Sequence, residues 1–88
     1  MPYIKQKDRL KFESEINDLV DELCNNEIKE GELNYVISSI IVRCMRQKGL
    51  SYHFINLVRG VLGCVWSEFY RRWGADYEDI KKGENGDI

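Results

Sequence analysis

The sequence predicts an all-α protein, a three-helix bundle in a single domain that covers residues 1–88. Apolar residues recur at helical spacing in three stretches, and only one proline occurs in 88 residues. With 43% hydrophobic and 32% charged residues, the composition is that of a globular protein. We expect helices at about residues 8–25, 30–47 and 51–73, after an extended N-terminal arm and before a short C-terminal helical turn plus tail at 75–88.

The first helix is predicted to lie at the edge of the bundle. Asp8 is a suitable first residue, because a carboxylate accepts hydrogen bonds from the free N–H groups of a helix start. The apolar positions that follow form one narrow stripe: Phe12, Ile16, Leu19, Val20, Leu23 and Cys24. The remaining positions are mostly acidic and are expected to face solvent.

The second helix is predicted to end before Gly49, since glycine commonly follows a helix C-terminus. Its apolar stripe consists of Leu33, Val36, Ile37, Ile40, Ile41, Cys44 and Met45. The run Val36–Val42 is also rich in the β-branched residues of strands. Its length and the continuing 3.6-residue period favour a helix.

The third helix is predicted to be long and central. Ser51 is a good N-cap, and Gly74 is expected to end the helix after Trp73. The apolar positions span a wide arc: Phe54, Leu57, Val58, Val61, Leu62, Val65, Phe69 and Trp73. So wide an arc must contact two partners, which places this helix in the middle of the bundle.

A stripe of small residues lies beside this arc and is formed by Asn56, Gly60, Gly63 and Ser67. A glycine inside a helix costs about 1 kcal/mol relative to alanine, so close approach of another helix is the expected compensation. That helix belongs either to the same chain or to a second copy. The stripe is therefore predicted to be a helix-packing contact or the seam of a homodimer.

Glu68 and Arg72 are charged residues that project into the apolar arc of the third helix. They stand four positions apart with the acid first, the favourable order for an ion pair within a helix. Because a buried charge needs a partner, we predict a buried Glu68–Arg72 ion pair. The alternative is a polar pocket in which Arg72, with Arg71, binds a small anion or a partner's carboxylate.

Charge is unevenly distributed along the chain, although the formal net charge is only -2. Residues 31–73 have a net charge of +4, whereas 1–30 and 74–88 each have −3. A dedicated nucleic-acid-binding domain is usually strongly basic. The basic middle segment still supports an alternative function, a weak nucleic-acid-binding helical module with contacts from Arg43, Arg46, Lys48 and Arg59.

Motifs of catalysis and of cofactor binding are missing: there is no glycine-rich phosphate loop, HExxH zinc motif or nucleophile elbow. We therefore predict that the protein is not an enzyme and holds no cofactor or metal. His53 is expected to be a surface or capping residue. Cys24, Cys44 and Cys64 are expected to be buried, reduced thiols of a cytoplasmic protein. No apolar run has the length of a membrane span.

The C-terminal part resembles a family of small uncharacterised proteins from prokaryotes and their viruses. The likeness rests on Glu68-Phe69-Tyr70-Arg71-Arg72, on Tyr77-Glu78-Asp79 and on Glu84-Asn85-Gly86-Asp87. It extends to Met1-Pro2-Tyr3-Ile4 and to Leu33–Ile37, and so to nearly the whole chain. Family members tend to have proline where this chain has Asp76, so no rigid turn is carried over. The resemblance implies no activity.

Several of these motif residues are polar, which is unusual for a core. We hypothesise that Tyr77, Glu78 and Asp79 dock onto Arg71 and Arg72, in the same chain or in a partner subunit. The function that the sequence favours is a cytoplasmic interaction or accessory protein that forms a homodimer through the third helix. An unknown protein partner is also compatible with this reading.

Overall fold

The computed structural model describes residues 3–88, which form helices and connecting turns without a strand. The elements are α1 (Gln6–Cys24), α2 (Glu30–Lys48), α3 (Tyr52–Phe69), the π-helical turn η1 (Tyr70–Gly74) and α4 (Ala75–Asn85). The predicted all-α class, with three helices and a long third helix, is confirmed. Residues 3–5 precede α1 without helical structure, as expected of the N-terminal arm, and Met1 and Pro2 lie outside the described residues.

Two helix boundaries follow directly from the residues predicted to make them. The Ser51 side chain accepts a hydrogen bond of 3.0 Å from the Phe54 backbone N–H, so Ser51 caps the start of α3. Gly49 ends α2 with a φ of 86°, in the left-handed region that glycine adopts without strain. Its N–H donates to the Met45 carbonyl at 2.7 Å. These caps fix the short turn between α2 and α3.

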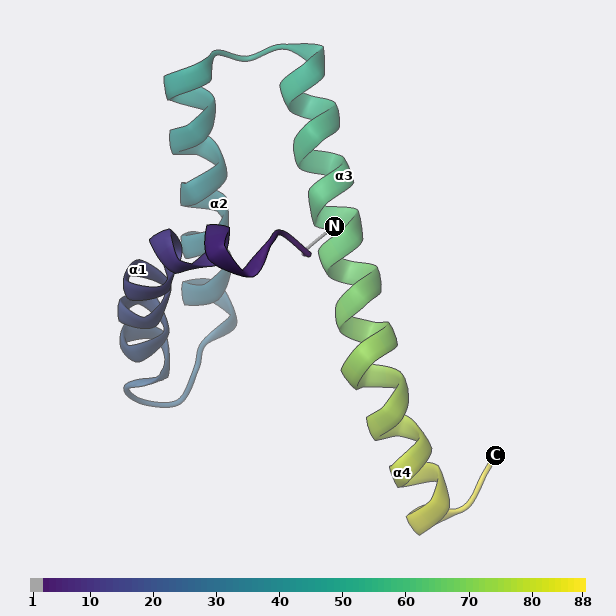
Figure 1. Ribbon diagram of the computed structural model, residues 1–88. Coiled ribbons are helices and arrows are strands. Elements are labelled where there is room, and N and C mark those ends of the chain that lie inside the picture. Colours follow the sequence, from purple (N-terminus) through teal and green to yellow (C-terminus); the bar gives the residue numbers. More distant parts are fainter. Residues whose placement is uncertain (1–2) are drawn as a thin grey trace.

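The helices are arranged openly (Figure 1). The chain runs up α2 and down α3, α1 lies across the lower end of α2, and α4 continues α3 beyond the other helices. The radius of gyration is 16.6 Å, against about 12 Å for a compact chain of this length. None of the described residues is buried, so the helices enclose no core.

The predicted helix end at Gly74 is wrong. Gly74 has the right-handed helical angles φ −65° and ψ −49°, and α4 continues for eleven residues. The helix instead ends at Gly86, whose φ is 90° and whose N–H donates to the Lys82 carbonyl at 2.8 Å. The C-terminal element is therefore longer than one or two turns, and the tail shortens to residues 86–88.

A contact between Tyr70 and Gly74 explains why this glycine lies inside the helix. A Cβ atom at Gly74 would lie 2.8 Å from Cδ2 of the Tyr70 ring, which is closer than such atoms approach. Glycine thus lets the ring lie flat along the π-helical turn. The nearby Glu78 carboxylate favours the neutral phenol of Tyr70 and raises its pKa above the ordinary value.

Replacing Gly74 by alanine is expected to displace the Tyr70 ring away from Glu78. The pKa of Tyr70 should then fall towards its ordinary value of 10.0, because the influence of the Glu78 carboxylate on the phenol weakens. Titration of the Tyr70 ring by NMR, with labelled tyrosine, measures this shift. Gly83→Ala is the matched control, since a Cβ at Gly83 meets nothing within 4 Å. An unchanged pKa in Gly74→Ala would contradict the assignment.

Candidate interaction surface

A continuous apolar groove lies between α2 and α3, with a volume of about 440 Å³. Its lining contains only hydrophobic side chains: Ile37, Ile40, Ile41, Cys44, Phe54, Leu57, Val58, Val61, Leu62 and Val65. They belong to the apolar stripes predicted for the second and third helices, whereas Leu33, Val36, Met45, Phe69 and Trp73 of those stripes lie outside the groove. The side chains that line the groove are half open to solvent, as Ile40 and Val65 show with 51% and 58% exposure.

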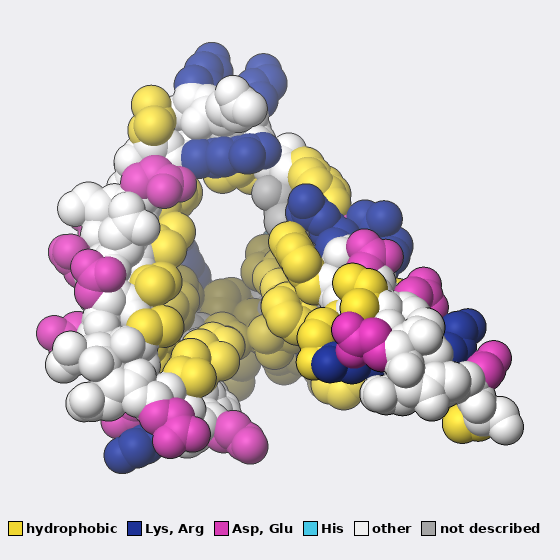
Figure 2. Space-filling model, turned by 90° about the horizontal axis from the view of Figure 1, so that it is seen from below, with side chains coloured by type: hydrophobic (Ala, Val, Ile, Leu, Met, Phe, Trp, Pro, Cys, Tyr) yellow, Lys and Arg dark blue, Asp and Glu magenta, His cyan; other side chains and the backbone are white. Residues whose placement is uncertain are grey.

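Seen from below, hydrophobic side chains gather on both sides of a central opening, and charged side chains stand on the outer surfaces (Figure 2). The opening separates the helices that a closed bundle would bring together. The amphipathic pattern of the sequence is therefore present in the structure, but the apolar faces remain uncovered.

The stripe of Asn56, Gly60, Gly63 and Ser67 lies on α3, about half a turn away from the centre of the groove-facing side. A Cβ atom at Gly60 or Gly63 would meet nothing within 4 Å, so no helix of the described chain approaches this face. The stripe borders a shallow hollow with Arg59, Cys64 and Glu68. Its use as a homodimer seam stays a prediction.

Glu68 forms an ion pair, but the predicted partner and environment were wrong. The carboxylate pairs with Arg71, at 2.8 Å between Oε2 and Nη2, and the pair is not buried. A three-residue spacing brings these two side chains onto one side of the helix. The Arg72 guanidinium instead lies 4.6 Å from the centre of the Trp73 ring, a cation–π contact.

Sequence reasoning missed a contact that connects the N-terminal arm to α3. The Tyr3 hydroxyl donates a hydrogen bond of 2.7 Å to Oε2 of Glu68, across 65 positions of the chain. The hydrogen bonds from Arg71 and Tyr3 lower the pKa of Glu68 from 4.5 to about 2. The one available signal was that Tyr3 is aromatic and stands in the N-terminal arm, which does not identify a partner.

Tyr77, Glu78 and Asp79 do not fold back onto Arg71 and Arg72 within the described chain. All three belong to α4, which continues the axis of α3 (Figure 1). Near the end of α4, Lys81 pairs with Glu84 at 3.2 Å. Contact of these three residues with the arginines of a partner subunit stays a prediction.

The four basic residues of the alternative nucleic-acid function are exposed: Arg43, Arg46, Lys48 and Arg59. None of them forms an ion pair with a carboxylate of residues 3–88. Their positive charge is therefore available to an acidic surface of any kind.

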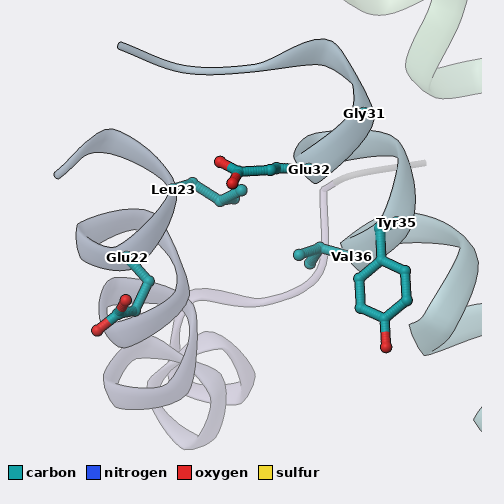
Figure 3. Close-up of a pocket in the computed structure, with 6 residues that line it drawn as sticks. All are labelled: Glu22, Leu23, Gly31, Glu32, Tyr35 and Val36. Atoms are coloured by element: carbon teal, nitrogen blue, oxygen red, sulfur yellow. The ribbon is translucent and has the colours of Figure 1, made fainter. Parts of the chain in front are cut away.

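Another hollow lies where α1 turns into α2, with a volume of about 350 Å³ (Figure 3). Leu23 and Val36 reach into it, whereas the Glu22 carboxylate points away from it. The carboxylates of Glu22 and Glu32 thus do not converge on one point. This arrangement gives no paired acid and base.

No cluster of three or more metal-ligating side chains occurs between residues 3 and 88. The prediction of buried cysteines is wrong, because Cys24 and Cys44 are exposed and Cys64 is half-buried. Cys44 lines the open groove, which explains its exposure. Within the part of the chain that the structure describes, no helix has both the length and the apolar composition of a bilayer span.

A family model with the description "Domain of unknown function (DUF6899)" matches residues 1–88. The chain belongs to the DUF6899 family. This confirms the resemblance to an uncharacterised family over the whole chain, while the prokaryotic and viral range and the C-terminal pattern stay predictions. Neither a curated protein nor a solved structure matches the chain.

The contact of Tyr3 with Glu68 is expected to depend on pH. Folding lowers the pKa of Glu68 from 4.5 to about 2. The ionised carboxylate therefore contributes to the free energy of unfolding above pH 4.5, and this contribution is lost as the pH falls towards 2. Carboxyl-carbon NMR should give a midpoint near 2 for Glu68. In Arg71→Gln the midpoint should rise towards 4.5, since the largest cause of the lowering is removed. Equal midpoints in the two proteins would contradict this assignment.

Proposed function

We propose that this DUF6899 protein is a cytoplasmic interaction protein that self-associates, with a second copy covering the groove between α2 and α3. The chain exposes 8289 Å². A folded monomer of 10.4 kDa exposes about 5400 Å². This excess of exposed surface carries the proposal, because the exposed side chains include the apolar stripes of the helices, which stable proteins cover.

The size of the excess fits a permanent dimer. Each chain has about 2900 Å² more surface than a compact monomer. Permanent dimers bury about 2000–5000 Å² or more in total, with apolar interfaces that resemble a divided core. The groove supplies an interface of this kind, since all ten of its lining residues are hydrophobic.

Charge favours a second copy over an unrelated partner. Residues 31–73 have a net charge of +4, and the two ends have −3 each. A second copy brings acidic ends to a basic middle in both directions at once, as a symmetric interface requires. The three free cysteines support a reducing compartment, the cytoplasm.

Two faces of α3 could form the dimer interface, the groove and the small-residue stripe. The groove is the better supported of the two. The small-residue stripe offers close backbone approach but little apolar area, and it borders charged residues such as Arg59 and Glu68. The groove offers an uncharged surface. Dimerisation through the groove assigns the protein a binding role without a catalytic step.

Val61→Asp tests the groove, because it places a charge at the centre of the apolar lining. We expect the dimer to weaken at least about 100-fold, since an unpaired carboxylate would be taken out of water. Sedimentation velocity measures the dissociation constant. Tyr52→Asp is the matched control, on the same helix but outside the groove and 86% exposed. It should associate like the unmodified protein.

Two results would contradict this assignment. The first is an unmodified protein that stays monomeric at the highest concentration it tolerates in solution. The second is a Val61→Asp dimer of undiminished affinity. In that case Ser67→Arg, on the small-residue stripe, tests the other seam, and loss of the dimer in this variant alone would move the interface there.

Thermal stability is expected to depend on protein concentration. Because residues 3–88 include no buried one, the chain gains its core on association, and the dimer is favoured by mass action. The melting temperature by circular dichroism should rise with each tenfold increase in protein concentration. A melting temperature that is independent of concentration would indicate a monomer that is stable by itself.

A further inference from the structure

The C-terminal arm, defined as residues 69–85, carries a second uncovered apolar surface. Phe69, Trp73, Tyr77 and Ile80 line one hollow along η1 and α4, and each is more than half exposed. Phe69 and Trp73 contact each other, with ring centres 5.7 Å apart. Among the described elements, α4 contacts mainly the helical turn before it, and it projects beyond α2 (Figure 1). Among the described residues, no other helix covers this surface.

We propose that the C-terminal arm of each chain lies in the α2–α3 groove of a second copy, so that the dimer forms by reciprocal exchange of arms. This rests on the self-association proposed above and names the segment that occupies the groove. The continuous helix from α3 to α4 holds the arm away from the groove of its own chain. Only the groove of another copy is within its reach.

The dimensions of the two surfaces agree. The apolar stripe of the arm extends from Phe69 to Ile80, and the α3 side of the groove extends from Phe54 to Val65. Both span eleven residue steps, which is about 16 Å along a helix. A helix that lies between two others in this way buries its apolar stripe against both.

One pair of charges also fits this placement. Asp76 lines the same hollow as the apolar stripe of the arm, and residues 74–88 have a net charge of −3. Lys48, the last residue of α2, falls on the groove-facing side of that helix, four and seven positions after Cys44 and Ile41. Arg43, Arg46 and Arg59 lie a third to half a turn away from the groove, so Lys48 is the basic residue placed to face the acidic arm of a partner.

A mixing experiment tests reciprocal exchange with one variant for each surface. Val61→Asp damages the groove and leaves the arm intact, while Ile80→Asp damages the arm and leaves the groove intact. Compared with the unmodified protein, dimerisation should weaken at least about 100-fold in Val61→Asp alone and at least about tenfold in Ile80→Asp alone, because every homodimer then lacks both exchange contacts. In an equal mixture, one intact arm meets one intact groove, so a heterodimer should form in preference to either homodimer.

Native mass spectrometry with one isotope-labelled variant counts the three species. Asn85→Asp is the control for the arm, because it adds the same charge on the opposite side of α4 and should dimerise normally. If Ile80→Asp dimerises as strongly as the unmodified protein, the exchange is overturned. Association through the groove then still stands on the weakening by Val61→Asp.

Two other outcomes also overturn the exchange. A mixture in which both variants remain monomeric shows that the two surfaces do not complement each other. If heterodimers form only in the proportion expected from random mixing of the two variants, the arm and the groove likewise do not complement each other. If the unmodified protein does not dimerise, the proposed self-association is wrong, and the exchange of arms is wrong with it. This result is obtained without the mixture.

Discussion

The structure depends on one constraint, that an amphipathic helix must cover its apolar stripe. Each helix of this chain has such a stripe, yet the described residues enclose no core. Hydrophobic burial is the dominant favourable term in folding, and it is proportional to the apolar area removed from water. The separate helices, the groove and the projecting arm are all consequences of stripes that meet no partner in the chain. In the proposed dimer they become an ordinary core, because the second chain supplies the missing layer.

The continuous helix through Gly74 decides how that layer is supplied. Had the glycine ended α3, residues 75–85 would have been free to turn back towards the groove of their own chain. The Tyr70 ring occupies the space beside Gly74, and the backbone stays helical through this residue, so η1 and α4 lie in line with α3 (Figure 1). A single residue without a side chain thus keeps the apolar stripe of the arm out of reach of its own groove.

Local signals predicted much of the fold, because helix caps act within a few residues. Ser51 and Gly49 act as caps where the sequence places them. Gly74 was misread, since a glycine that ends a helix and one that accommodates a ring look alike in sequence. The periodicity identified the residues of the groove, but periodicity does not tell whether a stripe is covered. For the same reason the thiols were predicted to be buried and Glu68 was paired with Arg72, while its contact with Tyr3 depends on distant parts of the chain.

That distant contact is polar, which limits what it contributes to stability. A hydrogen bond and an ion pair at a partly exposed carboxylate add little to the free energy of unfolding, because water competes for both. They do not replace a core. The Tyr3–Glu68–Arg71 cluster therefore positions the N-terminal arm against α3, whereas the free energy that keeps the helices together has to come from the apolar groove. Under the proposed self-association, folding and association are one process, in which a second chain provides what the first one lacks.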